Sequence, residues 1–217
     1  MASAAEMGGG VKITRLGLGL VCLLLPAVSA RADAYYVTVA GLGGEPDYEQ
    51  RFTALAKDFD KLFKASSGEA HVYTLTGGDA SRARLTDTLG TVARNAKPDD
   101  SFVLILIGHG SFDGVEYKFN LPGADISATD LANLCNRVTA KRQLVINTTS
   151  SSGGSISSLQ KPGRAIIAAT KAGTEKNATV FARYLVEALE DATSDLNKDE
   201  SISAMEAFQA AANKTAS

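Results

Sequence analysis

Short, largely apolar segments alternate along this chain with longer segments whose apolar residues recur at helical spacing. Segments of five or six such residues, bounded by glycine and polar residues, are typical of strands buried in a parallel sheet. The five segments of this kind are 35–40, 71–75, 102–107, 143–147 and 165–170. Strands that alternate with helices favour a parallel sheet with right-handed crossovers. We therefore expect one α/β domain, a three-layer α/β/α sandwich around a mainly parallel sheet.

The segments between and after these strands carry the helical pattern. It predicts helices over 47–65, 126–138, 180–192 and 203–212, and a further helix that follows 77–79 and runs through Leu85, Leu89 and Val92. We expect Asp47 to cap the first helix and Ser127 or Asp125 to cap the third, because short polar side chains accept hydrogen bonds from first-turn amides. Residues 115–120 alternate in hydropathy and predict one arm of a hairpin.

The first 32 residues have the order of a secretory signal. Lys12 and Arg15 precede an apolar stretch over 16–28, and small residues follow around Ala30. The stretch is too short for a comfortable membrane span, and no later segment is long enough. The sequence therefore predicts a signal peptide over 1–32 and an exported domain over 33–217, periplasmic or secreted, without a membrane span after cleavage.

Charge and cysteine content narrow the class further. The whole chain has a formal net charge of −2, and loss of residues 1–32 removes three basic residues and one acidic residue, which makes the charge more negative. A negative domain without a basic tract argues against a nucleic-acid partner. Only Cys135 would remain after cleavage, so no disulfide could form within the mature chain.

Two of the predicted strands end in motifs whose residues could take part in catalysis. The 102–107 segment runs into Gly108-His109-Gly110, and the 143–147 segment runs into a Thr/Ser/Gly stretch that contains Ser150. Ligands in open α/β sheets bind at the carboxyl ends of strands, so a base and a hydroxyl nucleophile could meet there. His109 is then the candidate general base and Ser150 the candidate nucleophile. The amides of Gly110 and Ser150 would form the oxyanion hole, with that of Gly110 free to point at the developing charge.

Each motif also has a simpler interpretation. In this interpretation His109 only ends its strand and bonds a neighbouring carbonyl, and three serines before two glycines make an ordinary loop. The other histidine, His71, begins its strand and is expected at the opposite edge of the sheet. Spacing alone leaves both interpretations of His109 open.

At these residues the chain resembles the caspase and legumain class of cysteine peptidases. That family has an apolar strand ending in His-Gly and a later strand ending in Cys-x-Ser-Gly, which stand here as His109-Gly110 and Ser150-Ser151-Ser152-Gly153. The segments 117–123 and 130–131 also look like the loop and helix between the two motifs in bacterial members. The resemblance implies the caspase fold and a peptide or protein substrate. The departure is Ser150 at the position of the nucleophilic cysteine, and Cys135 lies inside a predicted helix.

Two functions follow from this resemblance. The first is an exported peptidase-like hydrolase that uses His109 and Ser150. The second is a catalytically inactive relative that binds a peptide or another protein of the cell envelope. Loss of the cysteine favours the second, because a serine hydroxyl must lose its proton to a base during attack, whereas cysteine reaches the thiolate form near neutral pH. Retention of His109, Gly110 and the Ser152-Gly153 pair favours the first.

A third motif lies near the C-terminus. Oxygen-bearing residues occur at positions one, three, five, seven, nine and twelve of an EF-hand-like loop, with position seven offering its carbonyl: Asp195, Asn197, Asp199, Ser201, Ser203 and Glu206. Glu200 occupies position six, where the motif has glycine. The alternatives are a weak calcium site and a polar turn between two helices with Ser201 or Ser203 as cap.

Overall fold

The computed structural model describes residues 32–66 and 69–216, which belong to one compact unit, Arg31–Ser217. The predicted signal peptide, residues 1–32, lies outside the described residues except for its last position. The described strands are β1 Ala34–Ala40, β2 Ala70–Leu75, β3 Ser101–Ile107, β4 Gly110–Phe112, β5 Tyr117–Phe119, β6 Ile126–Ser127, β7 Arg142–Asn147 and β8 Arg164–Ala168. The described helices are α1 Pro46–Ala65, α2 Arg82–Asn95, α3 Ala128–Asn136, α4 Ile156–Leu159, α5 Phe181–Glu190 and α6 Ala204–Ala216.

The main sheet confirms the predicted α/β class. Five strands pair in the order β2-β1-β3-β7-β8, and every neighbouring pair is parallel. A small antiparallel sheet, β4-β5-β6, lies on the segment between β3 and α3. Because β1, β3 and β7 occupy the middle, their side chains are buried on both faces, as their apolar sequences predict.

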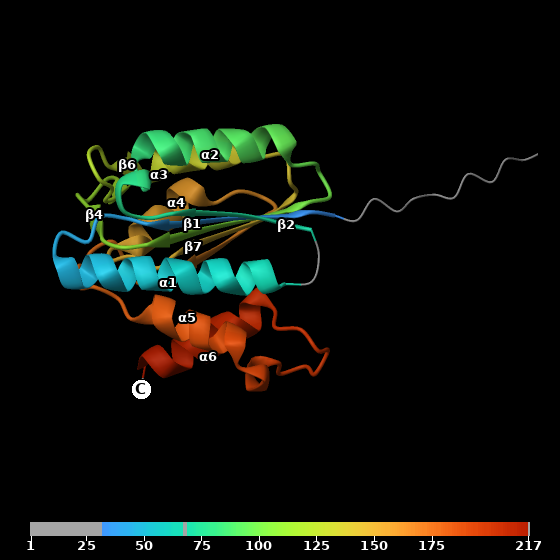
Figure 1. Ribbon diagram of the computed structural model, residues 1–217. Coiled ribbons are helices and arrows are strands. Elements are labelled where there is room, and N and C mark those ends of the chain that lie inside the picture. The colour runs from blue at the N-terminus through green and yellow to red at the C-terminus, as the bar shows by residue number, and fades with distance from the viewer. Residues whose placement is uncertain (1–31, 67–68, 217) are drawn as a thin grey trace, which may run out of the picture. The chain divides into compact units, whose positions relative to one another are not determined.

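Two hydrophobic clusters make the three layers. One lies between the sheet and α2, α3 and α4, and includes Leu85, Leu104 and Leu131. The other lies on the opposite face against α1, α5 and α6, and includes Phe59, Ile105 and Leu185. Figure 1 shows α2 to α4 on one side of the sheet and α1, α5 and α6 on the other. None of the helices within the described residues is long and apolar enough to cross a membrane.

The observed starts of α1, α2 and α3 agree only in part with the predicted N-terminal caps. The α3 cap is Ser127, which accepts a hydrogen bond from the Asp130 amide, so the first of the two predicted caps is confirmed. The α1 cap is Glu45 rather than Asp47, because Pro46 takes the first helical position, where its fixed φ and missing N–H fit. The 77–79 segment forms a separate 3₁₀ turn, and α2 begins only after Ser81 caps it.

Candidate functional site

The fold brings the two strand-end motifs together. Strands β3 and β7 are neighbours and run in the same direction, with Leu106 in register with Asn147. His109 and Ser150 therefore follow adjacent strands at the carboxyl edge of the sheet. His71 is the second residue of β2 and lies at the amino edge, where its ring stacks on Tyr35 and its Nε2 lies 3.5 Å from an Asp33 carboxylate oxygen.

The Ser150 hydroxyl is bonded to the backbone of Gly110. Its Oγ accepts a hydrogen bond from the Gly110 amide at 3.1 Å and donates to the Gly110 carbonyl oxygen at 3.1 Å. Ser150 is only 2% exposed. The Gly110 amide, which the sequence analysis expected to be free, is thus already occupied by the hydroxyl of the candidate nucleophile.

The register of the small sheet explains why Gly110 needs this partner. Gly110 lies opposite Phe119 in the antiparallel β4–β5 pair, and the Asn120 amide donates to the His109 carbonyl. That bond marks Gly110 and Phe119 as a non-hydrogen-bonded pair, in which both backbone groups of Gly110 point away from β5. They point toward Ser150, whose hydroxyl is able to donate one bond and accept another.

A buried polar cluster of Tyr117, Thr149 and Asn147 holds the backbone of Ser150 in place. The Tyr117 hydroxyl lies 2.5 Å from Thr149 Oγ1, and Thr149 Oγ1 lies 2.9 Å from the Ser150 carbonyl oxygen. The Asn147 side chain accepts from the Thr149 amide and donates to Ser155 Oγ at 3.0 Å. Burial raises the pKa of the Tyr117 phenol above its ordinary value, so this group stays a neutral hydrogen-bond partner.

The serines after Ser150 are equally bound within the protein. The Ser151 amide donates to the Glu175 carbonyl at 2.7 Å, with Ser151 in the left-handed region at φ 56°. The Ser152 hydroxyl accepts from the Thr170 amide at 3.0 Å. The 152–155 segment, for which an ordinary loop was one interpretation, is a 3₁₀ turn that leads into α4.

Phe112, on the β4–β5 hairpin, packs against the segments that follow β7 and β8. A Cβ added at Gly154 would lie 2.7 Å from the Phe112 ring, and one added at Gly173 would lie 2.4 Å from it. Both glycines are therefore in close contact with the ring, which leaves no room for a side chain. Together with the Ser150–Gly110 bonds, this contact fastens the β4–β5 hairpin across the carboxyl end of β7.

His109 packs among aromatic rings. Its ring centroid lies 4.8 Å from that of Tyr48 and 5.2 Å from that of Phe52, both in edge-to-face geometry. Within residues 32–66 and 69–216, no hydrogen bond joins the imidazole to Ser150 or to an orienting carboxylate. The ring thus has neither partner that a base in a dyad or triad uses.

The Cys135 thiol is not a substitute nucleophile. Cys135 lies in α3 and is fully buried. Desolvation raises the pKa of its thiol to about 11, so the reactive thiolate is scarce at neutral pH.

The C-terminal loop contains internal hydrogen bonds at several of its candidate calcium ligands. The Glu206 carboxylate accepts from the Leu196 and Asn197 amides and from Ser203, while the Glu206 amide donates to Ser203 Oγ. The last two bonds form a capping box at the start of α6. The bonds from Ser203 and the backbone hold the pKa of Glu206 below its ordinary value.

Two positions of the loop adopt the left-handed conformation. Lys198 has φ 59° and Glu200 has φ 68°, so Glu200 bears the backbone strain expected where the motif has glycine. Across the described part of the chain, no three or more His, Cys, Asp or Glu side chains are gathered as a metal-ligand group. Calcium binding by Asp195, Asn197, Asp199, Ser201, Ser203 and Glu206 stays a prediction.

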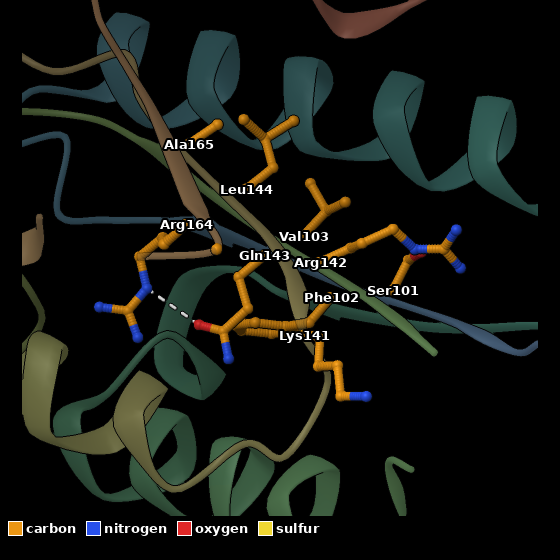
Figure 2. Close-up of a pocket in the computed structure, with 10 residues that line it drawn as sticks. Ser101, Phe102, Val103, Lys141, Arg142, Gln143, Leu144, Arg164 and Ala165 are labelled. Atoms are coloured by element: carbon orange, nitrogen blue, oxygen red, sulfur yellow. Dashed lines mark hydrogen bonds between the residues drawn. The ribbon is translucent and has the colours of Figure 1, made fainter. Parts of the chain in front are cut away.

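A shallow pocket of about 570 Å³ lies at the amino edge, away from His109 and Ser150. Lys141, Arg142 and Arg164 are its basic lining residues. Figure 2 shows these three side chains pointing in different directions, with Arg164 bonded to Gln143. Because the charges do not converge, this pocket has no anion-binding arrangement.

Comparisons with known proteins find likeness only among solved structures. No protein-family model matches the chain, and no curated protein matches it. The chain is similar to the Drosophila initiator caspase Dronc, with 12% identity, a TM-score of 0.49, and coverage of 75% of this chain and 66% of Dronc. It is similar to caspase-1 from Spodoptera frugiperda, with 14% identity, a TM-score of 0.47, and coverage of 76% and 71%.

A third similar structure is protein GSU0716 from Geobacter sulfurreducens, with 20% identity and a TM-score of 0.45. That match covers 55% of this chain and 51% of the Geobacter protein, so the chain spans about half of it. The chain also spans slightly less than two thirds of Dronc. These similarities concern the fold alone and assign the chain no substrate or activity.

Proposed function

We propose that this chain is an exported, peptidase-like domain that binds a peptide or protein partner in the cell envelope without cleaving it. The observation that carries the proposal is the pair of hydrogen bonds between Ser150 Oγ and the backbone of Gly110. These bonds engage the hydroxyl proton, one of the two hydroxyl lone pairs and the Gly110 amide that would donate to an oxyanion.

The contacts around this pair add support. A nucleophilic serine needs a base within hydrogen-bond reach, and the His109 ring is instead packed on Tyr48 and Phe52. The Phe112 ring, set between Gly154 and Gly173, fastens the hairpin over the end of β7. In this arrangement Ser150 serves as a tie between β4 and β7.

A hydrolase is the second candidate, because His109 and Ser150 follow neighbouring strands at one edge. In that function His109 would act as general base, Ser150 as nucleophile, and the Gly110 and Ser150 amides as the oxyanion hole. It requires the Ser150 side chain to rotate away from both Gly110 atoms before it can attack.

Labelling with a fluorophosphonate separates the two functions. We expect no adduct on Ser150 after prolonged incubation of the mature protein, because its hydroxyl is buried and lacks a base. Mass spectrometry of tryptic peptides checks this, with an authentic serine hydrolase in the same tube as the positive control. An adduct on Ser150 that disappears in His109→Ala would establish the hydrolase.

We also propose weak calcium binding by the 195–206 loop, in the extracellular range of roughly 10⁻⁴ to 10⁻³ M. The left-handed conformation of Glu200 supports it, since calcium loops need a sharp turn at this position.

Replacement of Glu200 by glycine tests this site. Relief of the left-handed strain should raise the unfolding free energy by about 0.5–1 kcal/mol without calcium, and millimolar calcium should raise Tm further. Magnesium should do less, and Glu206→Gln should remove the calcium effect. Melting curves with calcium and with chelator measure this. If calcium moves Tm in neither the wild type nor Glu200→Gly, the segment is only a turn.

A further inference from the structure

Strand β8 forms an open edge of the main sheet with an apolar groove beside it. Within the described residues no strand lies beyond it, since the sheet order ends β7-β8. A groove of about 620 Å³ follows this edge, with Ile156 and Phe208 among its lining residues. Ile156 is 38% exposed and Met205, also in the lining, is 63% exposed.

The backbone of β8 has hydrogen-bonding groups that face away from the sheet. The Gln143 amide donates to the Gly163 carbonyl, and the Ala169 amide donates to the Asn147 carbonyl. Backbone direction alternates along a strand, so the odd-numbered residues of β8 pair with β7. The N–H and C=O groups of Ile166 and Ala168 therefore point outward, toward the groove side of the edge.

This edge lacks the features that normally prevent strand addition. Natural edge strands are protected by charged side chains, proline or bulges. After the buried Arg164, β8 reads Ala-Ile-Ile-Ala, and Ile166 to Ala168 are all partly exposed. A peptide strand would satisfy the outward backbone groups, whereas an acyl chain has no groups to pair with them.

The charge of Lys171 indicates which ligand the groove would bind. Lys171 is the one charged residue among the described residues that line the groove, and it follows the carboxyl end of β8. Antiparallel pairing of two copies centred on Ile166 would place Lys171 opposite Lys161 at both ends, which like-charge repulsion disfavours. A strand parallel to β8 that ends in a carboxylate would instead bring its negative charge to Lys171.

We propose that the β8 edge binds an extended apolar peptide, parallel to β8, whose C-terminal carboxylate pairs with Lys171. This assignment rests on the proposed function and names the ligand class and the docking site. The peptide would extend the main sheet by one strand, and its alternate side chains would enter the groove between Ile156 and α6.

The test uses a fluorescein-labelled peptide of alternating valine and threonine with a free C-terminal carboxylate, and the mature protein. Fluorescence anisotropy should show binding of the free acid at least tenfold tighter than that of its C-terminal amide. Methylation of alternate peptide nitrogens should abolish binding, because it removes the donors to β8. Equal binding of all three peptides, or no binding of any, would overturn the proposal.

Two variants locate the site. Ala168→Pro removes an outward N–H but no bond to β7, so it should abolish binding while Tm stays near the wild type, with Ala168→Ser as the matched control that still binds. Lys171→Glu should abolish the preference for the free acid over the amide even if Ala168→Pro fails to fold. If Lys171→Glu still preferred the free acid over the amide, the assignment would be refuted. It would also be refuted if the wild-type protein self-associated in analytical ultracentrifugation and Ala168→Pro abolished that self-association.

Failure of this assignment is distinguishable from failure of the proposed function. Mass spectrometry of the incubated peptide should find it intact. A cleaved peptide would contradict the non-catalytic function, whereas an intact peptide that does not bind would refute only the β8 groove.

Discussion

Ser150→Ala should lower the free energy of unfolding by about 2–3 kcal/mol, because it leaves both backbone groups of Gly110 without their partner. The change removes one oxygen atom and adds no bulk, so packing stays the same. Urea denaturation measures the effect. Exposed Ser157→Ala, from the same segment of the chain, is the matched control and should stay within about 0.5 kcal/mol of the wild type.

A catalytic serine predicts a different pattern for the same variant. Removal of a nucleophile abolishes turnover and usually leaves unfolding unchanged or makes the protein more stable, because catalytic groups are arranged for function rather than stability. An unchanged unfolding free energy in Ser150→Ala would therefore contradict a structural role for the hydroxyl.

Arg164→Leu should cost about 3–4 kcal/mol of unfolding free energy. The Arg164 guanidinium is buried and donates to Gln143 Oε1, to the Leu159 carbonyl and to Asn136 Oδ1, each at 2.9 Å. Figure 2 shows the first of these bonds. The substitution leaves the buried Gln143 Oε1 and the Leu159 carbonyl unsatisfied, and it removes the bonds that link β8 to α3 and α4.

Thermal and urea denaturation check the Arg164 prediction. Arg142→Leu is the control, since Arg142 is the first residue of the neighbouring strand and is exposed, and it should shift stability by no more than about 0.5 kcal/mol. Arg164→Lys should fall between the two, because an ammonium keeps the charge but lacks the planar fork that reaches three acceptors. Equal stability of Arg164→Leu and Arg142→Leu would show that the buried network contributes nothing.

The sheet could be predicted from sequence because its strands are short and apolar, and the central strands β1, β3 and β7 are mostly buried. The 102–107 segment is apolar at every position, and it forms the centre of the sheet with 143–147 beside it. The placement of His109 and Ser150 side by side was expected from that parallel order together with the family resemblance, and β3 and β7 are indeed neighbours. The short elements α4, β4 and β6 escaped prediction, because two to four residues are too few to show a periodic pattern.

The chemistry of the site could not be predicted in the same way. Whether the Gly110 amide is free depends on the pairing of Gly110 with Phe119, which lies nine residues away, and on the side chain of Ser150, forty residues away. Spacing gives no register for such a short hairpin. The glycines at 110, 154 and 173 were the available signal, because each marks a close approach that only the folded chain reveals.

Hydrogen exchange at the Gly110 amide tests the central claim that the Ser150 hydroxyl ties β4 to β7. In the folded wild-type protein this amide should exchange slowly, because its hydrogen is donated to Ser150 Oγ. In Ser150→Ala it should exchange much faster relative to amides of the central strand β3, which serve as the internal reference for global stability. Rapid exchange at Gly110 in the wild type, or the same ratio to the β3 amides in both proteins, would contradict the account.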